Sequence, residues 1–282
     1  MTPRLAYSSN AYLRCGVEEA IARIAALGYA GIELMADTPH LWPAETSREK
    51  IDSVVALLEK HNLSISNVNA FMMNRIGDQR QPYWHPSWIE SDPAYRRIRV
   101  DHTKAALTLA NLLGAPHITT EPGGPLESGM TYAAAMDRFI AELRPVVAHA
   151  EREGVPLLIE PEPELLIERF EQYEEMLERI DSPMLGLNFD IGHAYCVSQE
   201  PAEWIPRMAE HTRHYHFEDI AATRKHAHLI PGDGAIDFAR TLRAIDDTGY
   251  AGWITIELYP YIDNPDEAGR RAKAHLERMI IA

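Results

Sequence analysis

The sequence predicts an α/β protein with the (βα)8 TIM-barrel fold, formed as a single domain by residues 1–282. Eight apolar, strand-like runs alternate with eight amphipathic, helix-like segments, and this alternation is typical of a parallel sheet that closes into a barrel. A length of 282 residues suits one large α/β domain or two small ones. Because no Pro-, Gly- or Ser-rich linker interrupts the alternation, we expect one domain.

A recurrent junction marks where helices end and strands begin. An amphipathic segment ends in glycine, a few residues follow, and an apolar run starts, as at Gly28, Gly114, Gly154 and Gly249. Glycine suits the residue after a helix because this position often has a left-handed backbone that penalises a side chain. Each of these glycines therefore predicts a helix-to-strand turn.

The periodicity of apolar residues predicts the elements in order along the chain. Strands are expected near residues 4–8, 31–35, 64–70, 117–121, 156–160, 185–190, 213–217 and 253–258. Helices are expected near residues 17–27, 47–61, 94–113, 131–153, 168–180, 201–210, 236–248 and 265–281.

Charge and composition favour a small-molecule ligand. The formal net charge is −15, with 42 acidic against 27 basic residues, which opposes binding to nucleic acid or to an anionic membrane surface. The N-terminal residues lack the apolar core of a signal peptide, and no later run is long enough to span a membrane. The two cysteines, Cys15 and Cys196, form neither a close metal-binding pair nor a secreted disulfide framework. We expect a cytoplasmic protein with two free thiols.

Four polar residues close strand-like runs in the second half of the chain: Glu160, Asp190, His216 and Glu257. Barrel enzymes keep their chemistry at strand ends. Side chains alternate along a strand, so the neighbours of these four point toward the covering helices and the four themselves point inward. Carboxylates gathered in a partly dry cavity cost several kcal/mol each, to within an order of magnitude, unless a positive charge compensates them.

A bound cation is the simplest compensation. Three carboxylates and one imidazole suit Mn²⁺, Mg²⁺ or Co²⁺ in octahedral geometry, with Zn²⁺ as a further candidate. Any one of these residues alone could be an ordinary salt-bridged or hydrogen-bonded group. Four on consecutive strands favour a metal site.

Further residues near the predicted site follow from the same alternation. Glu33, Asn69 and Glu121 are expected on the inward face near their strand ends, and His193 on the loop that leaves the strand of Asp190. His214 is expected one layer deeper than His216, as a buried supporting group. His226 and His228 fall in a loop and have weak individual claims.

The long connection over residues 72–92 contains Tyr83, Trp84, His85 and Trp88 and predicts a lid over the barrel mouth. An oligomer contact or plain surface packing is the alternative, so a homo-oligomer is left open.

Taken together, these motifs resemble the xylose-isomerase-like sugar isomerase/epimerase superfamily. The resemblance rests on Phe189-Asp190-Ile191-Gly192-His193, on His216-Phe217-Glu218-Asp219, and on Pro231-Gly232-Asp233-Gly234-Ala235-Ile236-Asp237-Phe238. It also includes Ile159-Glu160 and Ile256-Glu257, and it begins at Gly28-Tyr29-Ala30-Gly31-Ile32-Glu33-Leu34. It covers nearly the whole chain.

The resemblance is nearest to ketose 3-epimerases and hydroxypyruvate isomerases, and it implies a metal-dependent isomerase or epimerase of a keto-sugar or related polyol. It implies that Glu160, Asp190, His216 and Glu257 hold Mn²⁺ or a similar ion. It also implies that Glu160 and Glu257 are the two acid/base groups of an enediolate reaction. His193 and Arg224 would hydrogen-bond the substrate, and Asn69 and Glu33 are further expected substrate contacts.

Two departures accompany this resemblance. The segment Pro161-Glu162-Pro163-Glu164 is more acidic and more proline-rich than the family pattern, and the assignment of Arg224 requires a register shift in the loop after His216.

Three other functions are consistent with parts of the sequence. A dehydratase of an inosose or similar cyclic ketone would use the same enediolate-type carbanion to expel a hydroxyl group. An endonuclease IV-like nuclease would need extra histidines, but Glu121 stands where a histidine is required, and the acidic balance disfavours DNA. A non-catalytic sugar-binding module would not need the full ligand set. No phosphate-binding loop of the Gly-x-x-x-x-Gly-Lys type is present, so we expect an uncharged keto-sugar or cyclitol.

Overall fold

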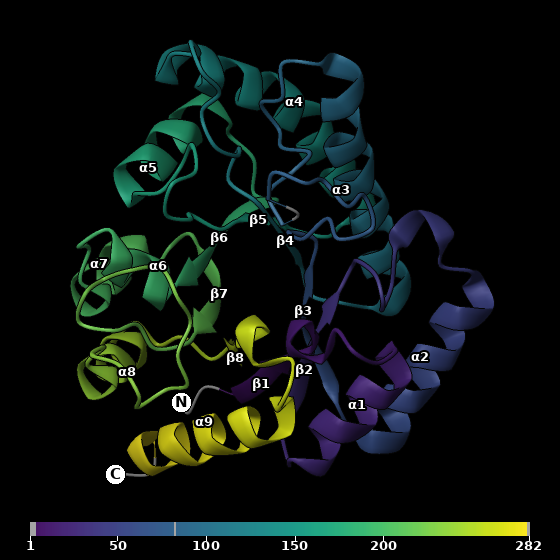
Figure 1. Ribbon diagram of the computed structural model, residues 1–282, viewed down its shortest axis with the longest axis vertical. Helices are drawn as coiled ribbons and strands as arrows, with labels where there is room; N and C mark the ends of the chain where they lie inside the picture. Colours follow the sequence, from purple (N-terminus) through teal and green to yellow (C-terminus); the bar gives the residue numbers. More distant parts are fainter. Residues whose placement is uncertain (1–3, 82, 281–282) are drawn as a thin grey trace.

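A computed structural model describes residues 4–81 and 83–280 and confirms the predicted TIM barrel. The eight strands form a closed barrel, which Figure 1 shows as an inner ring with the helices around it. The strands pair in parallel and in chain order, and β1 closes the ring against β8. Their bounds are β1 Arg4–Ser8, β2 Gly31–Met35, β3 Ser64–Asn69, β4 Ile118–Thr120, β5 Leu157–Ile159, β6 Leu185–Asp190, β7 Thr212–Phe217 and β8 Trp253–Ile256.

The helices follow the strands as expected, with one addition. Their bounds are α1 Val17–Ala26, α2 Arg48–His61, α3 Pro93–Leu113, α4 Tyr132–Glu153, α5 Phe170–Arg179, α6 Ile191–Cys196, α7 Pro201–Met208, α8 Phe238–Asp247 and α9 Pro265–Ile280. Three short 3-10 helices occur at η1 Ser9–Tyr12, η2 Pro43–Glu45 and η3 Tyr259–Tyr261. The addition is α6, where the sequence predicts a loop. This short helix forms because the Asp190 side chain caps its first turn by accepting a hydrogen bond from the His193 backbone N–H.

The predicted helix-to-strand turns are present at all four glycines. Gly28, Gly114, Gly154 and Gly249 have φ values of 77°, 68°, 68° and 75°, which lie in the left-handed region. A side chain would be strained there, so glycine lets each helix stop and the chain turn into the next strand.

Two layers make up the interior. The apolar core lies between strands and helices, where outward-facing Phe189 packs on Phe170 of α5 and Tyr215 packs on Tyr250. The barrel lumen is polar, and Ser66 and Thr255 hydrogen-bond across it at 2.9 Å. Apolar contacts thus hold the scaffold, while polar groups occupy the axis that leads to the strand ends.

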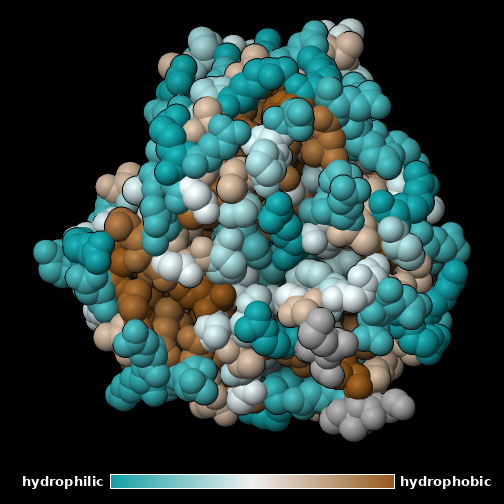
Figure 2. All heavy atoms as spheres, turned by 180° about the vertical axis from the view of Figure 1, so that it is seen from behind, coloured by the Kyte–Doolittle hydropathy of each residue, from teal (hydrophilic) through white to brown (hydrophobic). Residues whose placement is uncertain are grey.

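The outer surface is mostly hydrophilic. Figure 2 shows the face opposite to that of Figure 1, with an apolar area on the side where Figure 1 places α2 and α3. Leu112 of α3 and Leu126 are large hydrophobic residues that are exposed among those described. Within residues 4–81 and 83–280, no helix combines the length and the apolar character needed to cross a membrane.

Candidate active site

The structure brings together the four residues that the sequence predicts as metal ligands. Glu160 directly follows β5, Asp190 ends β6, His216 lies in β7 and Glu257 directly follows β8. One ligand atom from each lies within 4.8 Å of the others, and all four side chains are buried. They meet because four consecutive parallel strands carry their carboxyl ends to the same edge of the barrel.

His216 lies between carboxylates on both sides of its ring. Nδ1 is 2.7 Å from Oε1 of Glu160 and 3.8 Å from Oε2 of Glu257, while Nε2 is 2.7 Å from Oε2 of Glu33. Burial alone would lower the pKa of His216, but the three carboxylates hold this pKa well above its ordinary value. These carboxylates therefore favour the charged form of the His216 ring, and a cation bound by His216 would compete with its proton.

The buried carboxylates around His216 outnumber the positive charges beside them. Burial, followed by the charge of Glu160, raises the pKa of Asp190 to about 7. Burial also raises the pKa of Glu257 well above its usual range, and neighbouring carboxylates add to the effect. Oδ2 of Asp190 is buried and has no hydrogen-bond partner among the described residues. An unpartnered buried oxygen in an acidic cluster fits a divalent cation, so the donor set suits the ion that the sequence predicts.

Glu218 is a further acidic residue that the sequence analysis did not select. It is fully buried beside Asp190, and burial with the charge of Asp190 raises its pKa well above the usual range. A Cβ atom at Gly192 would overlap the Glu218 carboxylate, so a side chain at that position of α6 would displace Glu218. Its place two residues after His216, on the same face of the chain, was the available sequence signal.

A cavity of about 310 Å³ opens above these residues. This volume is in the range of small-ligand pockets. Glu160 and Glu257 reach its wall, together with apolar and aromatic groups. The lining comprises Asn69, Phe71, Met72, Gln81, Tyr83, Trp84, Glu160, Glu162, Glu164, His193, Lys225, His226, His228, Glu257 and Tyr259.

The connection over residues 72–92 forms part of this wall. Trp84 lines the cavity and donates a hydrogen bond from Nε1 to Oε1 of Glu162 at 3.2 Å. Trp88 instead is fully buried against Phe139 of α4. The buried Arg99 donates to the Phe71 and Pro86 carbonyls, which anchors both ends of the loop to α3. Trp84 therefore contributes to the cavity wall, whereas Trp88 belongs to the core.

The predicted substrate contacts differ in where they lie. Asn69 and His193 line the cavity, and His193 does so from helix α6 and not from a loop. Glu33 is buried beneath His216 and is not in the lining.

Two other residues lie away from the cavity wall. The Arg224 guanidinium lies 3.9 Å from the Tyr195 ring, donates to the Tyr195 carbonyl and pairs with Glu200. Glu121 is buried, and its Oε1 lies 3.8 Å from Nε of Arg99 in α3. It therefore pairs with α3 and is not one of the acidic residues at the cavity.

Comparison with known proteins yields relatives that are epimerases and dehydratases. Fructoselysine 3-epimerase of Escherichia coli O157:H7 is 25% identical over 274 residues, covering 95% of this chain and 94% of the relative. Inosose dehydratase of Clostridium beijerinckii (strain ATCC 51743 / NCIMB 8052) is 25% identical over 146 residues, covering 45% of this chain and 49% of the relative.

Solved structures share the fold over almost the entire chain. A D-tagatose 3-epimerase-like protein has a TM-score of 0.81 and 23% identity, with 98% of each chain covered. The IOLI protein, crystallised with a bound zinc atom, has a TM-score of 0.79 and 18% identity, also with 98% of each chain covered.

The model of one protein family extends over most of the barrel. This family, the xylose isomerase-like TIM barrel, matches residues 21–279 and agrees with the resemblance drawn from the strand-end motifs. The chain therefore belongs to the xylose isomerase-like TIM barrel family.

Proposed function

We propose that the protein is a divalent-metal-dependent isomerase or epimerase that acts on a keto-sugar or related polyol by proton transfer through an enediolate. The observation that carries this proposal is the placement of Glu160 and Glu257 together at the cavity wall, each with an oxygen within 3.8 Å of Nδ1 of His216. A relative named as a 3-epimerase, matched over 95% of this chain, supports the same reaction class.

Glu160, Asp190, His216 and Glu257 would hold the metal. The bound ion would polarise a substrate carbonyl and so acidify the neighbouring C–H bond. Three carboxylates and one imidazole favour Mn²⁺, although the zinc in the IOLI structure makes Zn²⁺ a candidate as well.

Two carboxylates then divide the proton transfers. Glu160 and Glu257 follow β5 and β8, which β6 and β7 separate in the ring. One carboxylate removes the proton from the carbon beside the carbonyl, and the other returns a proton to the opposite face, which inverts that carbon. Asn69 places its Nδ2 3.3 Å from Oε1 of Glu257 and orients this carboxylate. Trp84 and Tyr259 in the wall limit the access of water.

The charge of the cavity favours a substrate without phosphate. Four carboxylates line the wall, from Glu160, Glu162, Glu164 and Glu257, and Lys225 is the one lysine or arginine beside them within the described lining. A phosphate group would be repelled by this excess of negative charge. We therefore propose an uncharged keto-sugar or cyclitol as the substrate.

The test uses Glu160→Gln and Glu257→Gln with Mn²⁺ present. Each variant keeps an oxygen ligand but loses one base, so epimerisation should fall by about 10²–10⁴-fold. Glu160→Gln should still exchange deuterium from solvent into one epimer and Glu257→Gln into the opposite epimer. Metal content is measured in parallel, and variants that lose the ion are assayed again at higher Mn²⁺. Full epimerisation by both metal-loaded variants would rule out the two-base reaction.

A dehydratase is the second candidate because an inosose dehydratase is among the relatives, although it covers 45% of this chain. It would start with the same proton removal and then expel a neighbouring hydroxyl group. Product analysis of inososes and ketoses separates the two reactions, since loss of water changes the mass and epimerisation does not. A sugar-binding module without catalysis would show no exchange with any substrate.

A further inference from the structure

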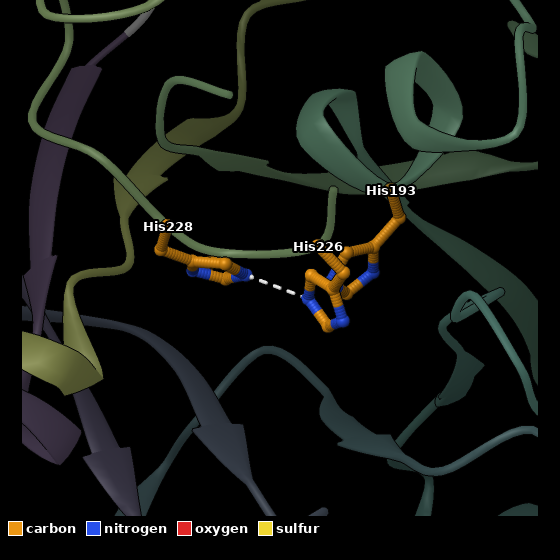
Figure 3. Close-up of side chains that lie close together, drawn as sticks. All are labelled: His193, His226 and His228. Carbon is orange, nitrogen blue, oxygen red and sulfur yellow. Dashed lines mark hydrogen bonds between the residues drawn. The ribbon is translucent and has the colours of Figure 1, made fainter. Parts of the chain in front are cut away.

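The loop that joins β7 to α8 carries part of the cavity wall. It runs over residues 218–237, and its residues Lys225, His226 and His228 line the cavity. Figure 3 shows the last two with their rings beside that of His193 in α6, at centroid distances of 4.8 and 5.6 Å. All residues of the loop are described, and none belongs to a helix or a strand. Specific contacts must therefore give the loop its shape.

Asp219 makes these contacts from the base of the loop, where it is 1% exposed. Its Oδ1 accepts from the backbone N–H of Ile220 at 2.9 Å and of Ile236 at 3.1 Å. Its Oδ2 accepts from the backbone N–H of Gly232 at 2.9 Å and of Gly234 at 2.8 Å. Hydrogen bonds to an ionised acceptor are about twice as strong as those between neutral groups. One buried carboxylate thus joins the start of the loop to its end.

Two backbone pairings close the same loop. The Asp219 N–H donates to the Leu229 carbonyl at 2.8 Å, and the Leu229 N–H donates back to the Asp219 carbonyl at 2.7 Å. The Ala235 N–H donates to the Ile220 carbonyl at 2.9 Å. The segment 221–228, which carries the three cavity-lining residues, is therefore held at both of its ends.

Two glycines let the backbone approach the Asp219 carboxylate closely. A Cβ atom at Gly234 would lie 2.4 Å from Oδ1 of Asp219 and 2.4 Å from the Ile220 carbonyl oxygen. Gly232 has a φ of 97°, a left-handed backbone that would be strained with a side chain. Glycine at both positions therefore makes room for the four hydrogen bonds.

We propose that Asp219 is a positioning residue for substrate binding, because its carboxylate holds the β7–α8 loop with Lys225, His226 and His228 at the cavity wall. None of the four predicted metal ligands lies in residues 218–237. Loss of the Asp219 hydrogen bonds should therefore weaken substrate binding and leave the predicted ion in place. The effect on substrate rests on the proposed function, whereas the placement of the loop can be measured without a substrate.

Limited digestion with trypsin tests the placement of the loop. Trypsin cleaves after Arg224 and Lys225 when this segment opens locally, so the cleavage rate follows the population of the open loop. Asp219→Asn keeps the size of the side chain but sets an NH₂ group against two backbone N–H groups. We expect cleavage at least about tenfold faster than in the wild type, because one lost hydrogen bond to a charged group corresponds to about this factor in an equilibrium constant.

A second variant and a control accompany this test. Gly234→Ala disturbs the same hydrogen bonds without changing Asp219, because its Cβ would overlap the carboxylate, and it should also be cleaved faster. Asp233→Asn is the matched control, since Asp233 is an exposed carboxylate of the same loop that pairs with Arg271 at 2.7 Å. This control should keep the wild-type cleavage rate. Circular dichroism and bound Mn²⁺ check that the barrel and the predicted ligand set persist in each variant.

Steady-state kinetics with a ketose substrate test the consequence for binding. Asp219→Asn and Gly234→Ala should raise KM about tenfold or more and lower kcat by less, because the loop contacts the substrate while Glu160 and Glu257 stay in place. A purely structural role would instead reduce the folded fraction, which lowers kcat and leaves KM unchanged.

Wild-type cleavage rates in both folded variants would overturn the proposal. Faster cleavage with an unchanged KM would also overturn it, because Asp219 would then hold the loop without serving the substrate. If the wild type converts no ketose or cyclitol, the proposed function fails, while faster cleavage in both variants would still support the placement of the loop by Asp219.

Discussion

Replacing Glu33 with Gln tests the hydrogen bond that holds His216 from below. Oε2 of Glu33 accepts from Nε2 of His216 at 2.7 Å and from Nδ2 of Asn67 at 2.8 Å, and Oε1 accepts from Oγ of Ser8 at 2.6 Å. Both Glu33 and His216 have no exposed surface. Gln removes the negative charge of Glu33, and it keeps an acceptor for His216 only when its NH₂ is turned toward Oγ of Ser8, so the charge-assisted hydrogen bond to His216 is lost.

The size of the effect follows from this geometry. A buried hydrogen bond to a charged group contributes about 1.5–3 kcal/mol, and about 1.4 kcal/mol corresponds to a tenfold change in Kd. Loss of the hydrogen bond that orients a metal-binding histidine usually weakens metal binding about 10–100-fold. The two ranges agree, so we expect the Kd for Mn²⁺ to rise about 10–100-fold in Glu33→Gln.

Isothermal titration of the metal-free protein with Mn²⁺ measures this Kd. Glu45→Gln is the matched control, because Glu45 is solvent-exposed and pairs with Arg75 at 2.6 Å far from the ligands. Thermal unfolding of both metal-free variants checks that the barrel persists. An unchanged Kd in folded Glu33→Gln would show that Glu33 does not position His216.

Four further predictions concern the metal, the residues of the 72–92 connection, and pH. Asp190→Ala should lose one equivalent of Mn²⁺ and remain folded, because the apolar core lies elsewhere; full Mn²⁺ occupancy would contradict the ligand assignment. Trp84→Ala should abolish the ligand-induced change in tryptophan fluorescence, whereas Trp88→Ala should keep it and lower the free energy of unfolding by about 3–5 kcal/mol because Trp88 is fully buried. Mn²⁺ affinity should rise with pH through about 7, since protons on Asp190 and His216 compete with the ion, and a pH-independent Kd would refute this. Burial raises the folded-state pKa of Asp190 to about 7, above its unfolded-state pKa of about 4. The contribution of Asp190 to the stability of the metal-free protein should therefore decline as pH rises from about 4 to about 7. Thermal unfolding of wild type and Asp190→Ala over this pH range would show the decline.

Local patterns account for the architecture and for the four strand-end residues. The two-residue alternation within each strand decides which side chains face inward, and the helix-terminating glycines mark each turn. Once eight units close in order, Glu160, Asp190, His216 and Glu257 meet with no further information. The same alternation predicted that Asn69 faces inward near the end of its strand, and Asn69 lines the cavity.

Side-chain direction in the loops could not be read from such patterns. Arg224 was expected at the substrate, but its guanidinium stacks on Tyr195 and pairs with Glu200. Trp84 and Trp88 lie four residues apart in the same loop, yet one lines the cavity and the other is buried in the core. Loops lack a repeating geometry, so neighbouring contacts decide which way each side chain points.

The sequence by itself determined the barrel, the inward face of each strand and the acidic character of the strand ends, because these depend on short-range periodicity and on parallel strand order. Only the tertiary structure decided which groups pair across the barrel. Glu33 and His216 are 183 residues apart, and the hydrogen bond between them depends on β2 facing β7 through the lumen. His193 joins His226 and His228 only because α6 packs against the β7 end of the barrel, which no local pattern encodes.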